Sequence, residues 1–557
     1  MLSRPIPCKR SHTASAPFVA LIVALVVLTG LAEFFTAGSA AAQGPPFAGL
    51  TTYQYDNFRR GADLAETALT RKNVKKSSFG KIFADPVDGY IYAQPLYLPS
   101  VNIAGIGVRN VVFVATENDS VYAFDADAPG PPLWLTSFIS PSAGVTPIPA
   151  AATLCGNIPT QVGITGTPVI DPSSQTLYVV AATQEGAGFV QRLHALDITT
   201  GQERAHSPVT ITANVPGAGQ GTQNGQIIFD PLRNLQRAAL TLSNGTVYIA
   251  WGSSCDQGVY HGWLLAYDSA DLTQTAAFNV TPNGSEGGMW MAAGGPAVDS
   301  NGDLVVATGN GTFDADLNPP ANADFGDSVL RLGFRSGVFG VVDYFTPFDQ
   351  ANLAVKDLDL GSGGVALLPD EPGTAIHTVV VSGKNRAIYL LDRDDLGGFR
   401  ADADNSLQTV KRALGGGFYA TPSYWKGHIY MIASNDVPRS FAVLERPDTR
   451  LSRRWSAGKV KFEGEGAPAT ISANGTTNGI LWAIFKAKSS NAVLYAFNAS
   501  SLTSTLYSSA QNAARDSAGG FVRFSVPSVA NGKVYIGTQT ALVAYGLNPP
   551  HPAQHPR

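Results

Sequence analysis

The stretch NVVFVATENDSVYAFDADAPGPPLW, residues 110–134, contains the unit from which the chain is built. Residues 111–115 form an apolar run with β-branched side chains, which predicts a buried strand. After a short turn, residues 121–124 predict a second strand, and Trp134 begins a third. A single hairpin of this kind cannot bury both of its faces, so it needs copies of itself packed alongside.

The same pattern of strand, turn and strand recurs seven more times, at intervals of roughly 50–70 residues. This regular repetition predicts an all-β fold, an eight-bladed β-propeller in which each blade is a four-stranded antiparallel sheet. An array of β-sandwiches is the rival architecture, but a sandwich does not repeat one hairpin so regularly. The further strand pairs are 176–184 with 191–201, 246–254 with 262–268, 303–311 with 327–333, 378–385 with 387–392, 428–436 with 440–445, 479–485 with 492–498, and 533–540 with 541–546.

The two ends of the chain are expected to close the ring. The eighth unit ends at Gly546 and lacks an outermost strand, whereas residues 79–87, FGKIFADPV, form a lone strand near the start. We predict that this strand completes the eighth blade, because closure removes an exposed sheet edge. The propeller therefore forms a single domain over residues 43–547, followed by a disordered tail at 548–557.

The N-terminus has the pattern of a secretion signal. Arg4, Lys9 and Arg10 precede the apolar run 18–31, and alanines 40–42 offer a cleavage site. An uncleaved anchor is the alternative, but the apolar run is short for a membrane span. We therefore expect residues 1–42 to be removed and the mature protein to be periplasmic or secreted, with no membrane span.

The charge balance excludes some partners. Loss of residues 1–42 removes three basic residues and one acidic residue, so the formal net charge falls from −4 to −6. This surface gives no reason to expect nucleic acid or an anionic membrane as a partner.

Two cysteines remain after the leader, which contains Cys8, is removed. Cys155 and Cys255 would then lie in an oxidising compartment, which predicts a disulfide between them. Two separate buried thiols are the alternative.

Long loops interrupt the repeat, and several common catalytic signatures are absent. The sequence has no H-E-x-x-H, P-loop, G-x-S-x-G, CxxCH or zinc-ligand spacing. Loops of this length are usually functional, and in a propeller they would cover one mouth of the central channel, where a ligand is expected. The longest are 139–165, 206–238, 280–294, 312–326 and 343–363.

The repeat resembles the propeller repeat of pyrroloquinoline quinone (PQQ) proteins. VYAFDADAPGPPLW, residues 121–134, is close to the family pattern of a tyrosine-containing strand, an aspartate turn and a tryptophan. Trp134 and Trp455 correspond to the tryptophans that dock each blade onto the next in that family. The resemblance covers most of residues 79–547 and implies the same eight-bladed fold.

Local stretches are similar to the catalytic chain of quinoprotein alcohol and methanol dehydrogenases. The resemblance implies Ca²⁺ and quinone contacts for Asn310 in VVATGNGTFD (305–314), and a catalytic, Ca²⁺-contacting role for Asp359 in DLDLGSGG (357–364). It implies a quinone contact for Lys384 in SGKNRAIYLLDRDD (382–395). Trp290, in EGGMWMAAGG (286–295), falls near the family's quinone-stacking tryptophan.

These residue types suit quinone chemistry. A bound Ca²⁺ prefers oxygen ligands and would polarise the quinone carbonyl. Asp359 would take the proton of an alcohol, and Lys384 would stabilise developing negative charge. Trp290 would give the quinone ring a flat surface.

The sequence also departs from that family. GSSCDQGVYHGWLLAYD (252–268) resembles the segment with a Ca²⁺-ligand glutamate, but its position falls on the uncharged Gln257. Asp256 is adjacent, yet on an extended strand it would point differently. The family's vicinal cysteine pair is absent.

Each candidate residue also has a structural interpretation. Asn310 with Gly311 is an ordinary turn at a strand end, and Asp359 is a loop cap. Lys384 is an exposed turn residue, Trp290 is core packing, and Asp256 and Gln257 are structural.

Two functional hypotheses follow. The first is a PQQ- and Ca²⁺-dependent oxidoreductase that acts on a small alcohol or sugar and passes electrons to a separate acceptor. The second is a propeller scaffold that binds envelope proteins or polysaccharide without redox chemistry. Asn310, Asp359 and Lys384 favour the first hypothesis, whereas Gln257 and the missing cysteine pair favour the second.

Overall fold

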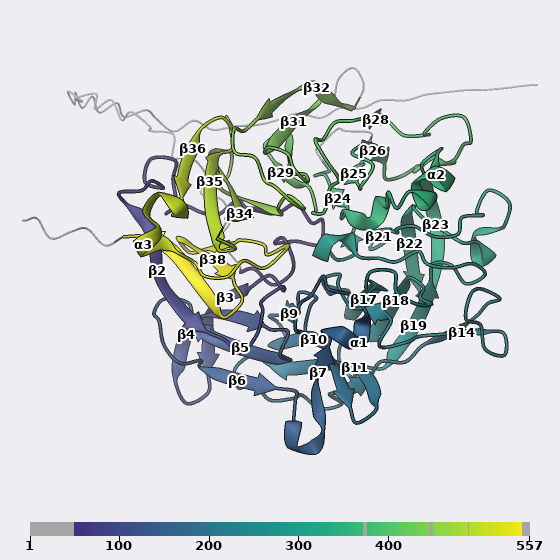
Figure 1. Cartoon of the computed structure of the whole chain (residues 1–557), viewed down its shortest axis with the longest axis horizontal. Coiled ribbons are helices and arrows are strands. Elements are labelled where there is room, and N and C mark those ends of the chain that lie inside the picture. Colours follow the sequence, from purple (N-terminus) through teal and green to yellow (C-terminus); the bar gives the residue numbers. More distant parts are fainter. Residues whose placement is uncertain (1–48, 371–375, 445–448, 488, 549–557) are drawn as a thin grey trace, which may run out of the picture. The chain divides into compact units, whose positions relative to one another are not determined.

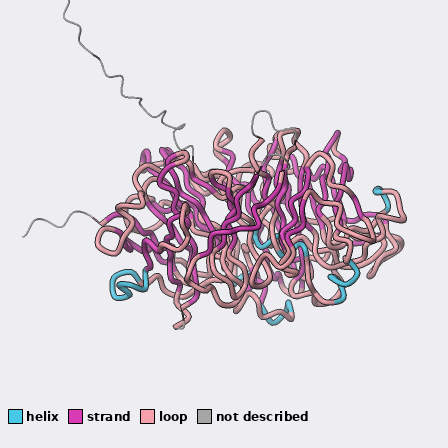
Figure 2. Tube along the Cα trace, turned by 90° about the horizontal axis from the view of Figure 1, so that it is seen from above, coloured by secondary structure: helices cyan, strands magenta, loops and turns pink. Residues whose placement is uncertain are grey.

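Eight mainly antiparallel sheets and one separate hairpin, β13 with β14 (Asn214–Pro216, Gln226–Ile228), make up a computed structural model that describes residues 49–370, 376–444, 449–487 and 489–548 (Figure 1). The predicted leader (1–42) and the tail from residue 549 lie outside the described residues. Strands and loops account for nearly all of the described chain, and its helices are short (Figure 2). None of these helices combines the length and apolar character that a bilayer crossing requires.

The eight sheets are the blades that the repeat predicts, and each blade contains the two strands expected from its repeat unit. Blades 1 to 4, from the inner strand outward, are β3–β6 (Leu96–Ile103, Gly107–Ala115, Ser120–Asp125, Trp134–Ser137), β9–β12 (Val169–Asp171, Thr176–Glu185, Gly188–Asp197, Val209–Thr210), β16–β19 (Thr241–Ser243, Thr246–Ser253, Trp263–Asp268, Gln274–Asn279) and β20–β23 (Ala297–Val298, Leu304–Ala307, Val329–Arg335, Val338–Thr346). Blades 5 to 7 are β24–β26 with β28 (Ala366–Leu367, Thr378–Ser382, Ile388–Asp392, Gln408–Val410), β29–β32 (Ser423–Trp425, His428–Met431, Arg439–Leu444, Arg450–Ala457) and β33–β36 (Ala469–Asn474, Thr477–Lys486, Ala492–Asn498, Thr505–Ser508).

Blade 8 closes the ring with strands from both ends of the chain. It consists of β37 (Ser528–Ala530), β38 (Lys533–Gly537), β39 (Ala541–Leu547) and the early strand β2 (Phe79–Pro86). β2 pairs antiparallel with β39, from Phe79 opposite Leu547 to Pro86 opposite Ala541. The predicted closure by residues 79–87 is confirmed.

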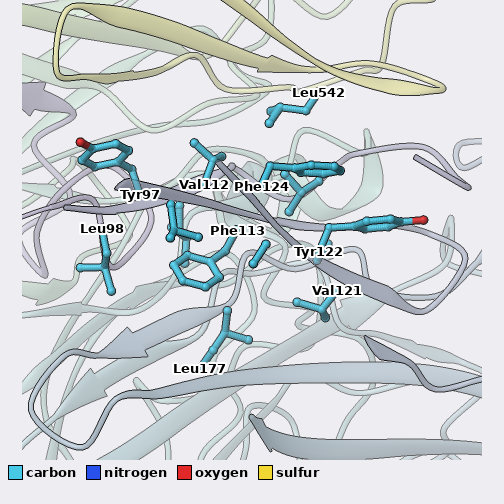
Figure 3. Close-up of a cluster of buried hydrophobic side chains, with 14 of the residues drawn as sticks. Tyr97, Leu98, Val112, Phe113, Val121, Tyr122, Phe124, Leu177 and Leu542 are labelled. Carbon is cyan, nitrogen blue, oxygen red and sulfur yellow. The ribbon is translucent and has the colours of Figure 1, made fainter. Parts of the chain in front are cut away.

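The strands are apolar on both faces because each blade is covered by its two neighbours. Figure 3 shows this around blade 1, where Val112 and Phe124 lie near Leu542 of blade 8 and Phe113 lies near Leu177 of blade 2. The clusters of apolar side chains between neighbouring blades therefore act together as the core of the protein. A single sheet could not bury a core by itself.

Trp134 docks blade 1 onto blade 2, as the resemblance implies. Its indole Nε1 donates a hydrogen bond to the carbonyl oxygen of Ile198 at 2.9 Å. The ring packs on Gly201 so closely that a Cβ there would lie 2.6 Å from it. The side chain of Trp455 lies outside the described residues.

The polar lead-in before β2 has a central position that its sequence pattern did not predict. Residues 50–62, here called the central segment, hydrogen-bond to the inner strand of every blade. The contacts join Leu50 to Tyr97 (blade 1), Thr51 to Ile170 (2), Asn57 to Leu242 (3) and Val298 (4), Phe58 to Leu367 (5), Arg60 to Tyr424 (6), Gly61 to Ile471 (7), and the Tyr55 hydroxyl to Val529 (8). The central segment thus satisfies backbone groups that the inner strands would otherwise leave unpaired.

Candidate functional site

A cavity of about 320 Å³, here called the central cavity, lies where the chain enters the inner strands. Each blade contributes at least one lining residue from the segment that precedes its inner strand. In blade order these include Tyr92, Ile158, Arg237, Trp290, Asp359, Tyr419, Glu465 and Phe524. Four of the five long loops contribute to this lining, as expected, whereas loop 312–326 does not.

The central segment supports the floor of this cavity. Tyr53, which is fully buried, packs in one cluster with Ala239, Ala293 and Val526. Each of these three residues follows a lining residue by one or two positions, namely Arg237, Ala292 and Phe524. The fold therefore gives the pocket at this end of the ring a packed floor.

Asp359, Lys384 and Asn310 meet at the blade 4 and blade 5 side. Asp359 is 3% exposed, and its Oδ1 accepts a hydrogen bond from the backbone N–H of Asn310 at 2.7 Å. Its other carboxylate oxygen forms an ion pair with Lys384, which also contacts Asp357. The structure thus brings together three of the residues that the sequence selected, although Asn310 itself does not line the cavity.

Burial and Lys384 act in opposite directions on the carboxyl of Asp359. Burial raises the pKa of its carboxyl above the usual value, and the nearby Lys384 opposes that rise. Burial favours the neutral form of Lys384, but the carboxylates of Asp359 and Asp357 outweigh it and raise the pKa of the amine. Lys384 is therefore held in its protonated form beside the Asp359 carboxyl.

Trp290 provides a flat aromatic surface. Its ring packs on the backbone of Gly252 and Gly288, where an added Cβ would lie 2.6 Å from ring atoms. Its Nε1 donates to the carbonyl oxygen of Ser253 at 2.9 Å, and Tyr260 contacts the ring edge-on at 6.0 Å. Trp290 is only partly buried, and it lines the cavity.

The backbone after Trp290 is strained. Met291, Ala292 and Ala293 all have φ between 44° and 73°, in the left-handed region. Non-glycine residues rarely occupy this region, and such strain gathers at ligand sites.

Asp256, rather than Gln257, borders the cavity. β17 ends at Ser253, and Cys255 and Asp256 both have φ of 54°, so the extended strand assumed from the sequence is wrong here. The left-handed turn brings Asp256 to the cavity, and its Oδ1 accepts hydrogen bonds from the Tyr260 hydroxyl at 2.6 Å and the Ser253 hydroxyl at 3.0 Å. Gln257 turns back and donates to the carbonyl oxygen of Cys255 at 3.1 Å.

Cys155 and Cys255 form the predicted disulfide, with their Cα atoms 5.6 Å apart. The bond joins a loop of blade 2 to the turn after β17 in blade 3, and both cysteines line the central cavity. It therefore fixes the turn that carries Asp256.

Sequence reasoning missed Glu286. It lies two residues before Gly288, one of the glycines on which the ring of Trp290 packs. Burial raises the pKa of its carboxyl, and the charges of Asp256, Asp359 and Asp357 raise it further. Asn310 Oδ1, which is buried, has no hydrogen-bond partner among the described residues. Carboxylates and an unsatisfied amide oxygen, the ligand types that Ca²⁺ prefers, therefore lie near this side of the cavity, although of these polar side chains only Asp256 and Asp359 line it.

The acidic side chains near the cavity do not form a complete set of metal ligands by themselves. No group of three or more His, Cys, Asp or Glu side chains within the described ranges is arranged to hold a metal ion.

Arg237 is a second residue that the sequence did not reveal. It is 6% exposed, lines the cavity, and its two terminal nitrogens have no hydrogen-bond partner among the described residues. Its guanidinium lies 5.0 Å from the ring centre of Phe524 and 5.5 Å from that of Tyr92. Its place four residues before the inner strand of blade 3, the same offset as that of Tyr92 in blade 1 and Phe524 in blade 8, is the signal that could have identified it.

Comparison with known proteins identifies the fold. No protein-family model matches the chain, and no curated protein matches it. The quinohemoprotein alcohol dehydrogenase ADHIIG of Pseudomonas putida HK5 is structurally similar, with a TM-score of 0.57 and 14% identity over 92% of this chain and 82% of that one. The quinohemoprotein alcohol dehydrogenase of Comamonas testosteroni gives the same values. This likeness establishes a shared propeller architecture.

Proposed function

We propose that this chain is an exported oxidoreductase that binds PQQ and Ca²⁺ in the central cavity and oxidises a small alcohol or sugar. One observation carries the proposal: a flat aromatic ring, a buried carboxylate and a lysine line the same cavity, as Trp290, Asp359 and Lys384. Such a pocket, with a few convergent polar groups and a perturbed carboxyl pKa, is the expected form of an active site.

The residues of the cavity fit a planar, anionic cofactor. Trp290 offers a stacking surface, and the unpartnered Arg237 offers positive charge to a carboxylate. Asp256, Glu286 and Asn310 would hold Ca²⁺. Bound PQQ would supply a two-electron acceptor, and Ca²⁺ would supply a Lewis acid beside it.

Asp359 and Lys384 would account for the hydroxyl proton that the alcohol loses. Oxidation of an alcohol to a carbonyl compound removes the hydroxyl proton and, from carbon, a hydride equivalent of two electrons and one proton, for which bound PQQ would supply the acceptor. Asp359 is placed to accept the hydroxyl proton, because its carboxyl is buried and its pKa is raised. Lys384 would hold Asp359 in position and offset negative charge as it develops. The electrons would leave to a separate acceptor.

Calorimetric titration of PQQ into the mature protein, with and without Ca²⁺, tests this proposal. We expect Ca²⁺-dependent binding that weakens at least tenfold in Asp359→Asn and in Lys384→Ala. Asp402→Asn serves as the matched control, because its carboxylate is 72% exposed and outside the cavity. A dye-linked screen of alcohols and sugars would follow.

A non-catalytic scaffold for envelope proteins or glycans is the second candidate function. The uncharged Gln257 and the absence of a closed acidic metal site in the described chain favour it. A folded protein that gives no heat with PQQ and Ca²⁺ would refute the oxidoreductase proposal and turn the search to such partners.

A further inference from the structure

Asp359 lies in a turn that glycines allow to pack closely. An added Cβ would lie 2.5 Å from its Oδ1 at Gly309 and 2.2 Å from its carbonyl oxygen at Gly383. At Gly361, within the turn, a Cβ would lie 2.5 Å from the backbone just before Gly309. The backbone N–H of Lys384 donates to the carbonyl oxygen of Asp359 at 2.9 Å. The turn therefore fits tightly between blade 4 and blade 5, and its position decides where the carboxylate points.

Asp327 links that turn to blade 4. Its Oδ1 accepts a hydrogen bond from the backbone N–H of Leu360, the residue after Asp359, at 3.0 Å. Its own N–H donates to the carbonyl oxygen of Gly309 at 2.7 Å. Gly309 precedes Asn310, whose N–H binds Asp359 Oδ1 at 2.7 Å. One residue thus holds the turn and the end of the strand together on either side of the Asp359 carboxylate.

Asp327 acts on the site from behind. It is fully buried and is not among the residues that line the central cavity, so it does not touch a ligand there. Burial raises the pKa of its carboxyl to about 8, although the hydrogen bond from Leu360 opposes the rise. The side chain is therefore a neutral acid near pH 7, and its Oδ1 serves as a hydrogen-bond acceptor rather than as a charge. Asparagine reproduces both properties.

We propose that Asp327 is a positioning residue for Asp359: through the N–H of Leu360 it fixes the turn so that the Asp359 carboxylate faces the central cavity. The inference rests on the proposed function, in which Asp359 accepts the hydroxyl proton of the substrate. Proton transfer requires the acceptor to lie within hydrogen-bond reach of that proton, and a displacement of about 1 Å can cost on the order of 100-fold in rate. Loss of the contact with Leu360 should therefore slow the reaction without removing any group that binds the substrate.

Asp119 provides a matched structural control. It comes just before β5, the third strand of blade 1, as Asp327 comes just before β22, the third strand of blade 4. Both are 0% exposed, with φ of 53° and 50°, and Asp119 Oδ1 also accepts a backbone N–H from the next blade, that of Ala182 at 3.2 Å. Leucine has the shape of aspartate but accepts no hydrogen bond. Asp119→Leu and Asp327→Leu therefore carry the same backbone strain and the same loss of an acceptor.

Crystal structures of the protein without added cofactor test the geometry. In Asp327→Leu we expect the hydrogen bond between the Asn310 N–H and Asp359 Oδ1 to be lost, whereas Asp327→Asn and Asp119→Leu should keep it. An Asp359 carboxylate that stays in place in Asp327→Leu would overturn the proposal. This comparison needs no PQQ, so it decides the positioning role even if the oxidoreductase proposal fails.

Dye-linked kinetics of the protein saturated with PQQ and Ca²⁺ test the consequence. We expect kcat to fall at least tenfold in Asp327→Leu, with KM for the alcohol or sugar within twofold of wild type, and Asp327→Asn to keep kcat within twofold. Asp119→Leu should lower Tm as Asp327→Leu does but leave kcat unchanged. If Asp327→Leu does not fold, Asp327→Gly takes its place, because glycine suits a φ of 50° and also removes the acceptor.

The outcomes separate the two proposals. Unchanged kcat in the folded Leu or Gly variant of Asp327, or an equal loss of kcat in Asp119→Leu, would overturn the positioning role. Wild-type protein that binds no PQQ would refute the proposed function alone, and the crystal structures would then decide whether Asp327 positions Asp359.

Discussion

At the scale of single residues, backbone conformation decides which side chain serves the central cavity. Asp256 and Gln257 are neighbours, and the family pattern points to Gln257. The left-handed turn at Cys255 and Asp256 reverses that choice, because it ends the strand and rotates Asp256 toward the cavity. The family pattern has a charged glutamate where this chain has the uncharged Gln257. The two-residue turn brings the carboxylate of the adjacent Asp256 to the cavity instead.

Asp256 should therefore matter for cation binding, whereas Gln257 should not. We expect Asp256→Asn to weaken Ca²⁺ binding in the presence of PQQ at least tenfold, because one ligand charge is lost. Gln257→Ala should change it less than twofold, because that side chain contacts the carbonyl of Cys255. Calorimetric titration of Ca²⁺ measures both, and an equal effect of the two substitutions would contradict the assignment.

Glu117 should make stability depend on pH. Burial raises the pKa of its carboxyl from 4.5 to about 7, although Gly163 and Thr165 donate hydrogen bonds to it. The folded protein therefore binds this proton more tightly than the unfolded chain, and stability falls as the pH rises from about 4.5 to 7. The loss is on the order of 3 kcal/mol above pH 7.

Replacement of Glu117 by glutamine should remove part of that pH dependence. The amide keeps an acceptor for Gly163 but carries no charge. We expect the fall in Tm between pH 5 and pH 8 to be smaller in Glu117→Gln than in wild type. Parallel pH profiles for the two proteins would show that Glu117 is not a source of the effect.

At the scale of elements, the outer strands hold neighbouring blades together. Trp134 begins β6 and contacts the turn of blade 2 through Ile198 and Gly201. The contact combines aromatic burial with a hydrogen bond from the indole. It couples two sheets that share no strand pairing.

Trp134→Ala should destabilise the protein by about 3–5 kcal/mol, as expected when a large buried aromatic side chain is removed. Trp134→Phe keeps most of the packing and loses the hydrogen bond to Ile198, so its cost should be about 1–3 kcal/mol. Thermal unfolding of both variants gives the order of the effects. A Phe variant as unstable as the Ala variant would assign the docking to the hydrogen bond rather than to packing.

At the scale of the whole molecule, the central segment joins all eight blades and supports the cavity floor. Arg59 is the buried cation of this segment. Its guanidinium donates to the carbonyl oxygens of Pro296 and Tyr53 and to the hydroxyls of Thr52 and Thr241. These bonds link the segment to blade 3 and to the approach to blade 4.

Arg59→Met should lower the free energy of unfolding by about 3–5 kcal/mol, because buried acceptors lose their donors. Arg60→Met is the matched control, because Arg60 is partly exposed and pairs with Asp56 on the segment itself. We expect a large drop in Tm for the first variant and a change within about 0.5 kcal/mol for the second. Equal Tm values would show that the central segment does not stabilise the ring.

Local patterns in the sequence were sufficient for the repeat architecture. Each unit carries its own strands and turns, so residues 110–134 and their seven copies predict the blades, and residues 79–87 predict the closure. The resemblance also selected Asp359, Lys384 and Trp290, and all three line the central cavity.

Tertiary structure alone decided which residues meet. Arg237, Glu286 and the central segment have no periodicity, because their partners are scattered among several blades. Asp256 reached the cavity through a left-handed turn that a strand pattern does not reveal. Strand formation depends on neighbours along the chain, whereas a cavity at the centre of a ring depends on segments that are distant in sequence, so the sequence by itself determined the blades and the fold determined the site.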